Sequence, residues 1–218
     1  TDLRDTGGLR LAVNDEEYAI LQQEVAFIKK HHAIECPVFG RDQVNSLLPG
    51  GSFVGAVYVP TEAMFNPYKV VNGMREFIEA KGARVLTGCQ VTSVTRNTDG
   101  SFSVSIRHRG TIRAKKVVYC LNAYTPELLP ELAGTMMCFR GQMIATDLLP
   151  DTLLQTFPQS SMSCNNSNEY WRLHGGRLLV GGMRHAVRGH QVGIIDDGEV
   201  SPAVYERLRS FVNEALPV

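Results

Sequence analysis

Two arginines, Arg140 and Arg172, are the residues of this chain best suited to bind an anionic small molecule. A guanidinium can hold a carboxylate through two parallel N–H···O bonds, which an ammonium cannot do. Arg172 directly follows Tyr170 and Trp171 in a short β-rich run. If that run is a strand, the two aromatic side chains point to opposite faces, so one can cover a ligand while the other packs in a core. The alternative for Arg172 is a surface arginine that pairs with Glu169 or with solvent.

Other motifs that carry chemistry are absent from the sequence. A strand–GxGxxG–helix unit, which cradles a dinucleotide pyrophosphate, does not occur, and the paired glycines at 50–51, 175–176 and 181–182 lack its spacing. The sequence also has no P-loop, HExxH or GxSxG motif and no cluster typical of a metal site. We therefore name no catalytic base and no metal ligand.

Composition narrows the class of protein. The 218 residues carry 22 basic and 22 acidic side chains, so the formal net charge is zero, which argues against nucleic acid or an anionic membrane surface as the main partner. No apolar run approaches the roughly 20 residues that a membrane span needs. The five cysteines are odd in number and widely spaced, which favours free thiols in a reducing, cytoplasmic compartment.

The ends of the chain also carry information. The first residues are polar and acidic and do not form a signal peptide. There is no initiator methionine, and the chain stops just after an expected helix. We therefore expect a fragment of a longer protein.

The central stretch, residues 66–123, alternates helix and strand patterns. Apolar residues recur every three or four positions over 70–81, which predicts a helix with one buried face. Pro67 suits the first turn of this helix, and Gly82 suits the left-handed residue after its end. Short strand patterns follow at 83–86, 90–95 and 102–106. The apolar run 117–123 does not alternate with polar residues, so we expect a strand buried on both faces.

The segments on either side predict a second set of elements. Asn14 is a suitable N-cap for a helix that reaches about His31 and has acidic residues in its first turn. We expect the buried stripe of this helix to consist of Tyr18, Leu21, Val25 and Ile28. Further expected elements are a short helix at 43–48, a strand at 53–59 and a long strand at 136–146. An antiparallel meander is expected at 162–164, 170–173 and 177–182, and a last helix begins at Pro202.

This order of elements resembles the FAD-dependent oxidoreductases of the D-amino acid oxidase type, a family that includes glycine oxidase, sarcosine oxidase and γ-glutamylputrescine oxidase. In that family a helix opened by an acidic or amide residue and Pro leads to Gly-Ala-Arg-Val, and a later strand reads Val-Val-x-Ala-x-Gly-Ala-Trp. The counterparts here are Asn66-Pro67, Gly82-Ala83-Arg84-Val85 and the run from Val117 to Tyr124. Further matching segments are Thr6 to Ala12, Arg140-Gly141-Gln142-Met143, and Tyr170-Trp171-Arg172 followed by Gly176 to Gly182.

The resemblance implies an α+β or α/β fold of two discontinuous domains. Residues 1–65 would form the first part of a substrate domain, an antiparallel sheet with helices on one side. Residues 66–134 would form the middle part of an FAD-binding domain, and residues 135–218 the second part of the substrate domain and a trailing helix. The family's GxGxxG fingerprint lies upstream of everything in this chain, and a final flavin-contacting segment lies downstream. We therefore expect that FAD is the cofactor of the full-length protein and that this chain alone neither retains it nor is active.

The resemblance also points to cofactor-binding residues. Val91 corresponds to an adenine-side position at which backbone N–H and C=O make the contact; a plain core valine is the alternative. Cys120, Leu121, Asn122 and Ala123 fall where the family's chain passes close to the cofactor, and small residues suit such a close approach. The family usually has Gly at the position of Asn122, and Asn tolerates left-handed backbone. The alternative is a strand that ends at an Asn turn.

The activity that the resemblance implies is oxidation of the C–N bond of an amino acid or amine to an imine. Arg140, Tyr170 and Arg172 would then bind the substrate; for Arg140 the alternative is that Arg-Gly-Gln forms a turn. In the sarcosine oxidase branch a lysine over the flavin promotes reaction with oxygen. The corresponding position here is Leu179, which implies an electron acceptor other than oxygen.

Two other functions are compatible with these residues. One is a flavoprotein of the same fold that acts on a hydroxy acid or glycerol phosphate, although no cluster of phosphate-binding Lys or Arg is evident. The other is a non-catalytic binding domain that has lost the cofactor. The expected partner is a small-molecule amine or amino acid, without nucleic acid or a membrane span, and whether the chain forms a homo-oligomer is left open.

Overall fold

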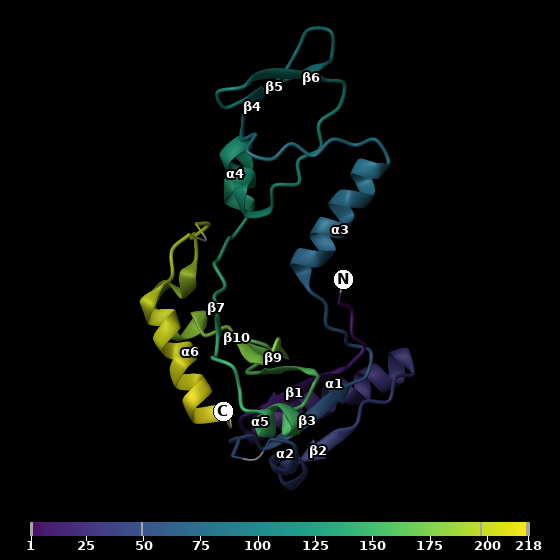
Figure 1. Ribbon diagram of the computed structural model, residues 1–218, viewed down its shortest axis with the longest axis vertical. Helices are drawn as coiled ribbons and strands as arrows, with labels where there is room; N and C mark the ends of the chain where they lie inside the picture. Colours follow the sequence, from purple (N-terminus) through teal and green to yellow (C-terminus); the bar gives the residue numbers. More distant parts are fainter. Residues whose placement is uncertain (1, 49, 197, 217–218) are drawn as a thin grey trace. The chain divides into compact units, whose positions relative to one another are not determined.

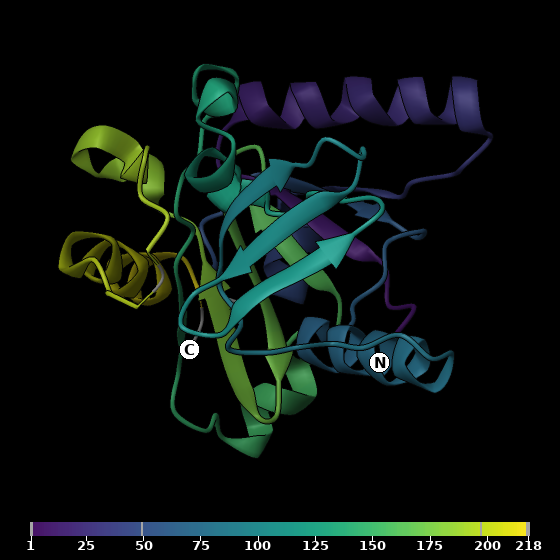
Figure 2. The ribbon, with the colours of Figure 1, turned by 90° about the horizontal axis from the view of Figure 1, so that it is seen from above.

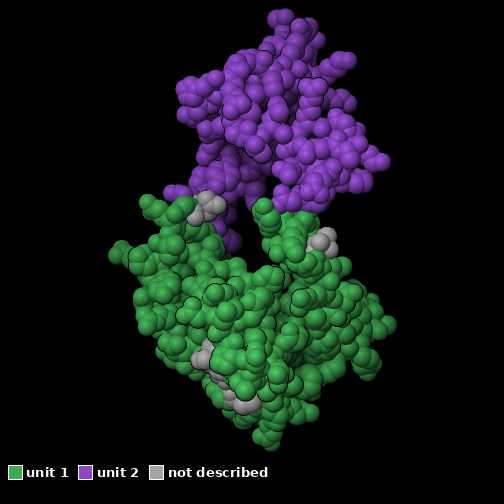
Figure 3. Space-filling model, viewed as in Figure 1, with its two compact units in different colours: residues 1–70, 140–191, 197–218 green, residues 71–139, 192–196 purple. Residues whose placement is uncertain are grey.

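The computed structural model describes residues 2–48, 50–196 and 198–216, and it divides into two compact units (Figure 3). Unit 1 consists of residues 1–70, 140–191 and 197–218, and unit 2 consists of residues 71–139 and 192–196. The chain therefore changes unit at 70/71 and 139/140, whereas the division expected from the sequence lies at 65/66 and 134/135. Unit 2 also includes a short piece of the later chain, 192–196.

Unit 1 is built on a seven-stranded sheet with the strand order β2-β3-β1-β8-β9-β10-β7 (Figure 1). Its strands are β1 (Gly8–Ala12), β2 (Val38–Gly40), β3 (Gly55–Val59), β7 (Met143–Ala145), β8 (Ser161–Cys164), β9 (Glu169–His174) and β10 (Arg177–Gly181). Neighbouring strands are antiparallel except for β1 and β8, which are parallel. The predicted meander is confirmed as β8, β9 and β10.

The prediction of a long strand at 136–146 is wrong, because only Met143–Ala145 of this run, β7, belongs to the sheet. The residues before β7 bond to a later loop instead. The N–H of Arg140 donates to Gln191 O at 3.1 Å, and the N–H of Gly193 donates to Cys138 O at 2.8 Å. Backbone groups used in this way cannot extend the ladder with β10.

Helices cover both faces of the sheet in unit 1, and not one face as expected. Helix α1 (Asp15–His32) begins at the predicted cap, where Asn14 Oδ1 accepts a bond from the N–H of Glu17 at 2.8 Å. Its apolar stripe packs over β1 and β3 in a small cluster, which includes Tyr18, Leu21, Val25, Ile28, Ala12, Val57 and Val59. Because α1 covers only these strands, the same face over β8, β9, β10 and β7 is free of this helix.

The opposite face carries the main core. Two helices contribute to this side of unit 1, α2 (Arg41–Leu47) and α6 (Pro202–Ala215). A further short helix, α5 (Asp151–Thr156), precedes β8. The core cluster includes Val44 and Leu48 near α2, Val204, Leu208 and Phe211 on α6, and Met162, Trp171 and Val180 on the sheet. The predicted last helix, which begins at Pro202, is thus confirmed. Short 3₁₀ turns, η3 (Arg184–Ala186) and η4 (Arg188–Gln191), follow β10.

Unit 2 contains a three-stranded antiparallel sheet with the order β4-β5-β6 (Figure 2). Its elements are β4 (Val91–Arg96), β5 (Phe102–Ile106), β6 (Gly110–Ala114), η1 (Asn122–Tyr124), α4 (Thr125–Leu128) and η2 (Pro130–Thr135). Helix α3 (Pro67–Ala80) leads into this unit and starts at Pro67, as predicted. Gly82 has a φ of 91°, which confirms the left-handed residue after the helix.

Three predictions for the central stretch are wrong. Residues 83–86 and 117–123 form no strand, and Val118 is 83% exposed. The apolar face of α3 is not buried either, and Phe77 is 64% exposed. A strand exists only where a neighbouring strand accepts and donates its hydrogen bonds. Unit 2 provides no such partner for these runs and, within the described residues, no buried side chain.

Among the residues that the structure describes, no helix is long and apolar enough to cross a membrane.

Candidate functional site

The part of the sheet face that α1 leaves uncovered carries a cavity of about 340 Å³. Its wall is mostly apolar and includes Met64, Phe65, Met143 and Leu179. The polar side chains in this wall are Ser161, Tyr170 and Arg172. A concave, largely apolar site with a few polar groups is the usual form of a small-molecule binding site.

Strand register explains why these side chains meet. Trp171 pairs with Met162, and Tyr170 pairs with Ser163, so the next pair in the same register places Ser161 opposite Arg172. On the other side of β9, Arg172 pairs with Leu179. Because partners in a register point to the same face, Ser161, Arg172 and Leu179 form one row across the sheet.

The aromatic pair on β9 points to opposite faces, as predicted. Tyr170 is 39% exposed and lines the cavity, whereas Trp171 is 2% exposed. The indole of Trp171 stacks on Phe53 with ring centroids 6.0 Å apart and meets the ring of Phe211 edge-on at 5.5 Å. The ring of Tyr170 lies against Gly181, where an added Cβ would fall 2.5 Å from it. Burial of Trp171 thus anchors β9 and fixes the position of its neighbours Tyr170 and Arg172.

Arg172 is held in place but keeps donors for a ligand. Its Nη1 donates to the carbonyl oxygen of Phe65 at 2.9 Å. A guanidinium has five N–H donors, so this one bond orients the group without exhausting it. The alternative of a pair with Glu169 is wrong, because Glu169 is fully buried on the opposite face.

Arg140 lies elsewhere in unit 1. It lines a second cavity, of about 520 Å³, together with residues of β7 and α6. Its Nε and Nη2 donate to Gln191 Oε1 at 3.2 and 2.8 Å, and its Nη1 donates to the carbonyl oxygen of Glu199 at 2.7 Å. The structure therefore brings Tyr170 and Arg172 together in one cavity and places Arg140 in another.

The residues expected to contact a cofactor all lie in unit 2. Val91 is on β4, an edge strand of its sheet, and pairs with Ile106. An edge strand directs one row of backbone N–H and C=O groups away from the sheet. Cys120 is exposed, and Asn122 has a φ of 46°, so this position is left-handed, as the resemblance to a glycine position implies. These features fit backbone contacts to a flat ring system.

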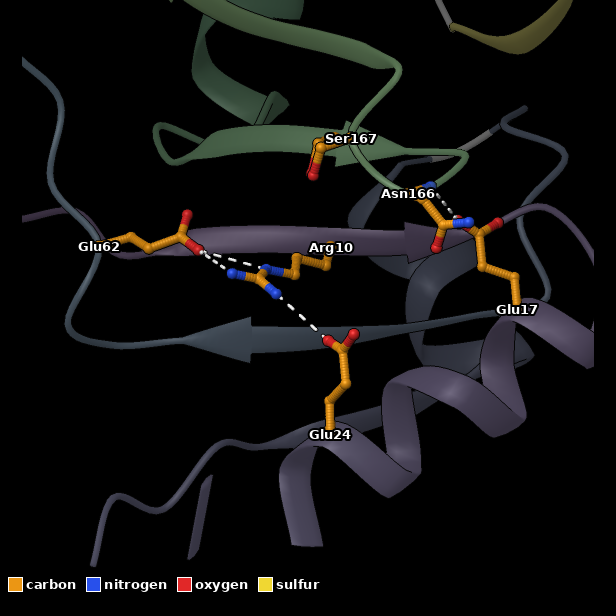
Figure 4. A network of polar contacts seen from close by, with 7 residues as sticks. Arg10, Glu17, Glu24, Glu62, Asn166 and Ser167 are labelled. Atoms are coloured by element: carbon orange, nitrogen blue, oxygen red, sulfur yellow. Dashed lines mark hydrogen bonds and ion pairs between the residues drawn. The ribbon is translucent and has the colours of Figure 1, made fainter. Parts of the chain in front are cut away.

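Sequence reasoning missed a charged network beside the cavity (Figure 4). Arg10 on β1 donates to Glu62 Oε1 from Nε at 3.3 Å and from Nη2 at 3.0 Å, and to Glu24 Oε2 from Nη1 at 3.2 Å. The hydroxyl of Ser161 is 3.4 Å from Glu62 Oε2. Alternation along β1 could have placed Arg10 on this face, but nothing local in the sequence indicates its partners.

A second polar group lies at the turn between β8 and β9. Glu169 accepts a hydrogen bond from Asn165, and its Oε1 is 3.3 Å from His185 Nδ1.

The thiol of Cys164 lies next to this group. Burial, together with the nearby carboxylates of Glu169 and Glu17, raises the pKa of this thiol. Among the described residues, no group of three or more His, Cys, Asp or Glu side chains could hold a metal ion.

Comparisons with known proteins identify the class. The family model for FAD dependent oxidoreductases (DAO) matches residues 1–218, and the chain belongs to this family. Mitochondrial sarcosine dehydrogenase from Mus musculus is 26% identical over 190 residues, which cover 81% of this chain and 20% of that protein.

Solved structures show the same fold. Glycine oxidase from Geobacillus kaustophilus matches with a TM-score of 0.77 at 15% identity, over 99% of this chain and 55% of that chain. FAD-bound L-alpha-glycerophosphate oxidase from Mycoplasma pneumoniae matches with a TM-score of 0.72 at 14% identity, over 99% of this chain and 58% of that chain. The chain thus spans about half the length of these structures and a fifth of the curated relative. The expected fold class is confirmed.

Proposed function

We propose that this chain is part of an FAD-dependent enzyme that oxidises the C–N bond of an amino acid or amine to an imine. The observation that carries this proposal is the apolar cavity that holds Tyr170 and the anchored guanidinium of Arg172. Relatives named sarcosine dehydrogenase and glycine oxidase support an amine substrate. When bound, FAD supplies the acceptor for a hydride from the carbon next to the amine nitrogen.

The residues of this chain bind and orient the substrate. Arg172 holds the substrate carboxylate through charge-assisted hydrogen bonds, while its bond to Phe65 O keeps the guanidinium in one orientation. The ring of Tyr170 covers the substrate. Met143 and Leu179 provide apolar contacts that exclude water and strengthen the ion pair. Leu179 stands where the sarcosine oxidase branch has the lysine that promotes reaction with oxygen. An apolar residue there supports an electron acceptor other than oxygen.

Unit 2 provides contacts to the cofactor in this proposal. The backbone of Val91 on the open edge of β4 binds the adenine side. Cys120, Leu121, Asn122 and Ala123 approach the ring system, and the left-handed Asn122 directs the chain there. No GxGxxG turn for the pyrophosphate occurs in this sequence, so the chain alone does not retain FAD.

A second candidate substrate class is a hydroxy acid or glycerol phosphate. The fold likeness to L-alpha-glycerophosphate oxidase favours it. The cavity favours a carboxylate, because Arg172 is the one cationic side chain among the described residues of its wall. A phosphate dianion is usually held by several cationic or N–H donors. A third alternative, a binding domain without cofactor, predicts no flavin at all.

The test uses the longest natural form of the protein, loaded with FAD and kept anaerobic. Flavin absorbance is followed while glycine, N-methylglycine, proline, lactate and glycerol 3-phosphate are added separately. We expect at least one amino acid to bleach the flavin, and no bleaching with glycerol 3-phosphate. Bleaching by lactate or glycerol 3-phosphate alone would show that the substrate is a hydroxy acid or glycerol phosphate. A protein that never binds flavin would support a binding domain without cofactor.

A further inference from the structure

Ser161 is a polar residue of the cavity wall to which the proposed function gives no role. It begins β8, lines the cavity and stands opposite Arg172 in the strand register. Side chains opposite each other in an antiparallel pair have Cβ atoms roughly 4.5–5.5 Å apart. Ser161 and Arg172 also line the same cavity of about 340 Å³, so a small ligand bound to Arg172 lies within reach of the Ser161 hydroxyl.

Glu62 sets the direction of this hydroxyl. The Ser161 Oγ donates to Glu62 Oε2 at 3.4 Å, because a carboxylate that is ion-paired with Arg10 can only accept. Two donors of Arg10 hold the other oxygen, Oε1. The carboxylate lies close against β1, since a Cβ added at Gly8 would fall 1.9 Å from Oε2. With its proton directed toward Glu62, Ser161 presents oxygen lone pairs as acceptors to its surroundings.

The cavity thus places a donor and an acceptor side by side. Arg172 offers N–H donors to an anion, and Ser161 offers an acceptor to an N–H group. The charges behind Ser161 agree with this polarity, because the single positive charge of Arg10 is shared by two carboxylates, Glu24 and Glu62. A net negative charge favours a nearby ammonium over a neutral or anionic group.

We propose that Ser161 accepts a hydrogen bond from the substrate amine and that Glu62 is the positioning residue that holds the Ser161 hydroxyl. This inference rests on the proposed function and narrows its substrate class to α-amino acids, including N-methylated ones. In such a substrate one carbon separates the carboxylate from the amine, which matches neighbouring sites on adjacent strands. Ser161 then selects amino acids against carboxylic acids that lack the amine.

The experiment compares an amino acid with its carbon isostere on the FAD-loaded, longest natural form. The pairs are glycine with propionate and N-methylglycine with butyrate, in which a carbon replaces the nitrogen. The KM of the amino acid and the inhibition constant of the isostere are measured for wild type, Ser161→Ala and Glu62→Gln. Ser163→Ala is the matched control, because Ser163 is on the same strand and face but lines a different cavity.

Loss of one hydrogen bond to a charged group predicts that Ser161→Ala raises the KM of the amino acid about tenfold. The inhibition constant of the isostere stays within about twofold, since it makes no such bond. Glu62→Gln gives the same selective loss, because its amide can donate to Ser161 and turn the hydroxyl into a donor toward the cavity. Ser163→Ala changes neither constant. Flavin content and the thermal midpoint verify that each variant is folded.

Equal changes for amino acid and isostere, or none for either, overturn the role of Ser161 while leaving the proposed function intact. Failure of the proposed function has a different signature, in which no amino acid is oxidised by wild type. Binding of the same ligand pairs to the cavity is then measured by titration calorimetry. Preferential binding of the amino acid that disappears in Ser161→Ala supports the inference, and equal binding of the pair refutes it.

Discussion

The replacement of Arg172 by lysine or alanine is the sharpest test of the proposed carboxylate site. In the structure the guanidinium is fixed by one bond to Phe65 O at 2.9 Å, and the surrounding wall is mostly apolar. Two further charge-assisted bonds to a carboxylate in such a site contribute about 2–4 kcal/mol, or roughly 30- to 1000-fold in kcat/KM. Alanine removes all of this. Lysine also loses much of it, because an ammonium cannot bond to Phe65 O and present a planar fork at the same time.

The assay measures kcat/KM for an acid substrate and for its decarboxylated amine, with the longest natural form of the protein. We expect Arg172→Ala to lower the value for the acid by the amount given above and to affect the amine far less. Arg140→Ala provides the comparison, since its guanidinium is already bonded to Gln191 and Glu199 in another cavity and its loss should affect both substrates alike. Equal losses on acid and amine in Arg172→Ala would refute the carboxylate role and show that Arg172 is structural.

Three further predictions concern the rest of the molecule. First, all five cysteines are alkylated after unfolding. In the native protein near pH 8, the exposed thiol of Cys120 reacts first, and the buried thiols of Cys36 and Cys164 react last. Burial raises the pKa of these two thiols and so lowers the fraction present as reactive thiolate. The alkylation rates of Cys36 and Cys164 therefore rise only at higher pH. Mass spectrometry that finds protected cysteine pairs after unfolding would contradict the prediction of five free thiols. Second, Trp171→Ala lowers the free energy of unfolding by about 3–5 kcal/mol in denaturant titrations. Trp171→Phe costs clearly less, because the buried Nε1 that it removes has no partner among the described residues, and equal losses would argue against the stacking contacts. Third, the chain as given leaves gel filtration without flavin, and a yellow, stoichiometric complex would show that the pyrophosphate is held in some other way.

Elements whose signals are local could be predicted from the sequence. The cap at Asn14 and the three- and four-residue spacing of its apolar stripe define α1 without any knowledge of what it packs against. The meander of β8, β9 and β10 was predictable because its turns are short and its strands alternate. The opposite orientation of Tyr170 and Trp171 follows from strand geometry alone.

The errors lie where structure depends on a distant partner. The apolar runs 83–86 and 117–123 have the composition of strands, yet they remain unpaired because a strand is completed only by the backbone of another. The apolar face of α3 has the right period, but unit 2 contains no buried side chain to receive it within the described residues. Periodicity predicts which side of an element can be buried, and it does not show whether a cover exists.

The same distinction applies to the cavity. That Tyr170 and Arg172 lie on one face of the sheet could be predicted, because they stand two positions apart on one strand. The contacts that complete the site join residues 52 and 99 positions apart, from Arg10 to Glu62 and from Ser161 to Glu62. A serine at the start of a strand and a glutamate in a loop carry no local signal for such a network.

Arg10 links the two halves of this sheet face. One side of its guanidinium bonds to Glu24 on α1, and the other bonds to Glu62 beside the cavity (Figure 4). The parallel pairing of β1 with β8 places Arg10 next to Ser163, so the network runs along the border between the helix-covered strands and the open strands. A small helix-covered cluster on one side and a ligand cavity on the other thus share one charged group. Because Glu62 is held from the α1 side and itself holds Ser161, the packing of α1 contributes to the polarity of the cavity as well as to the stability of the fold.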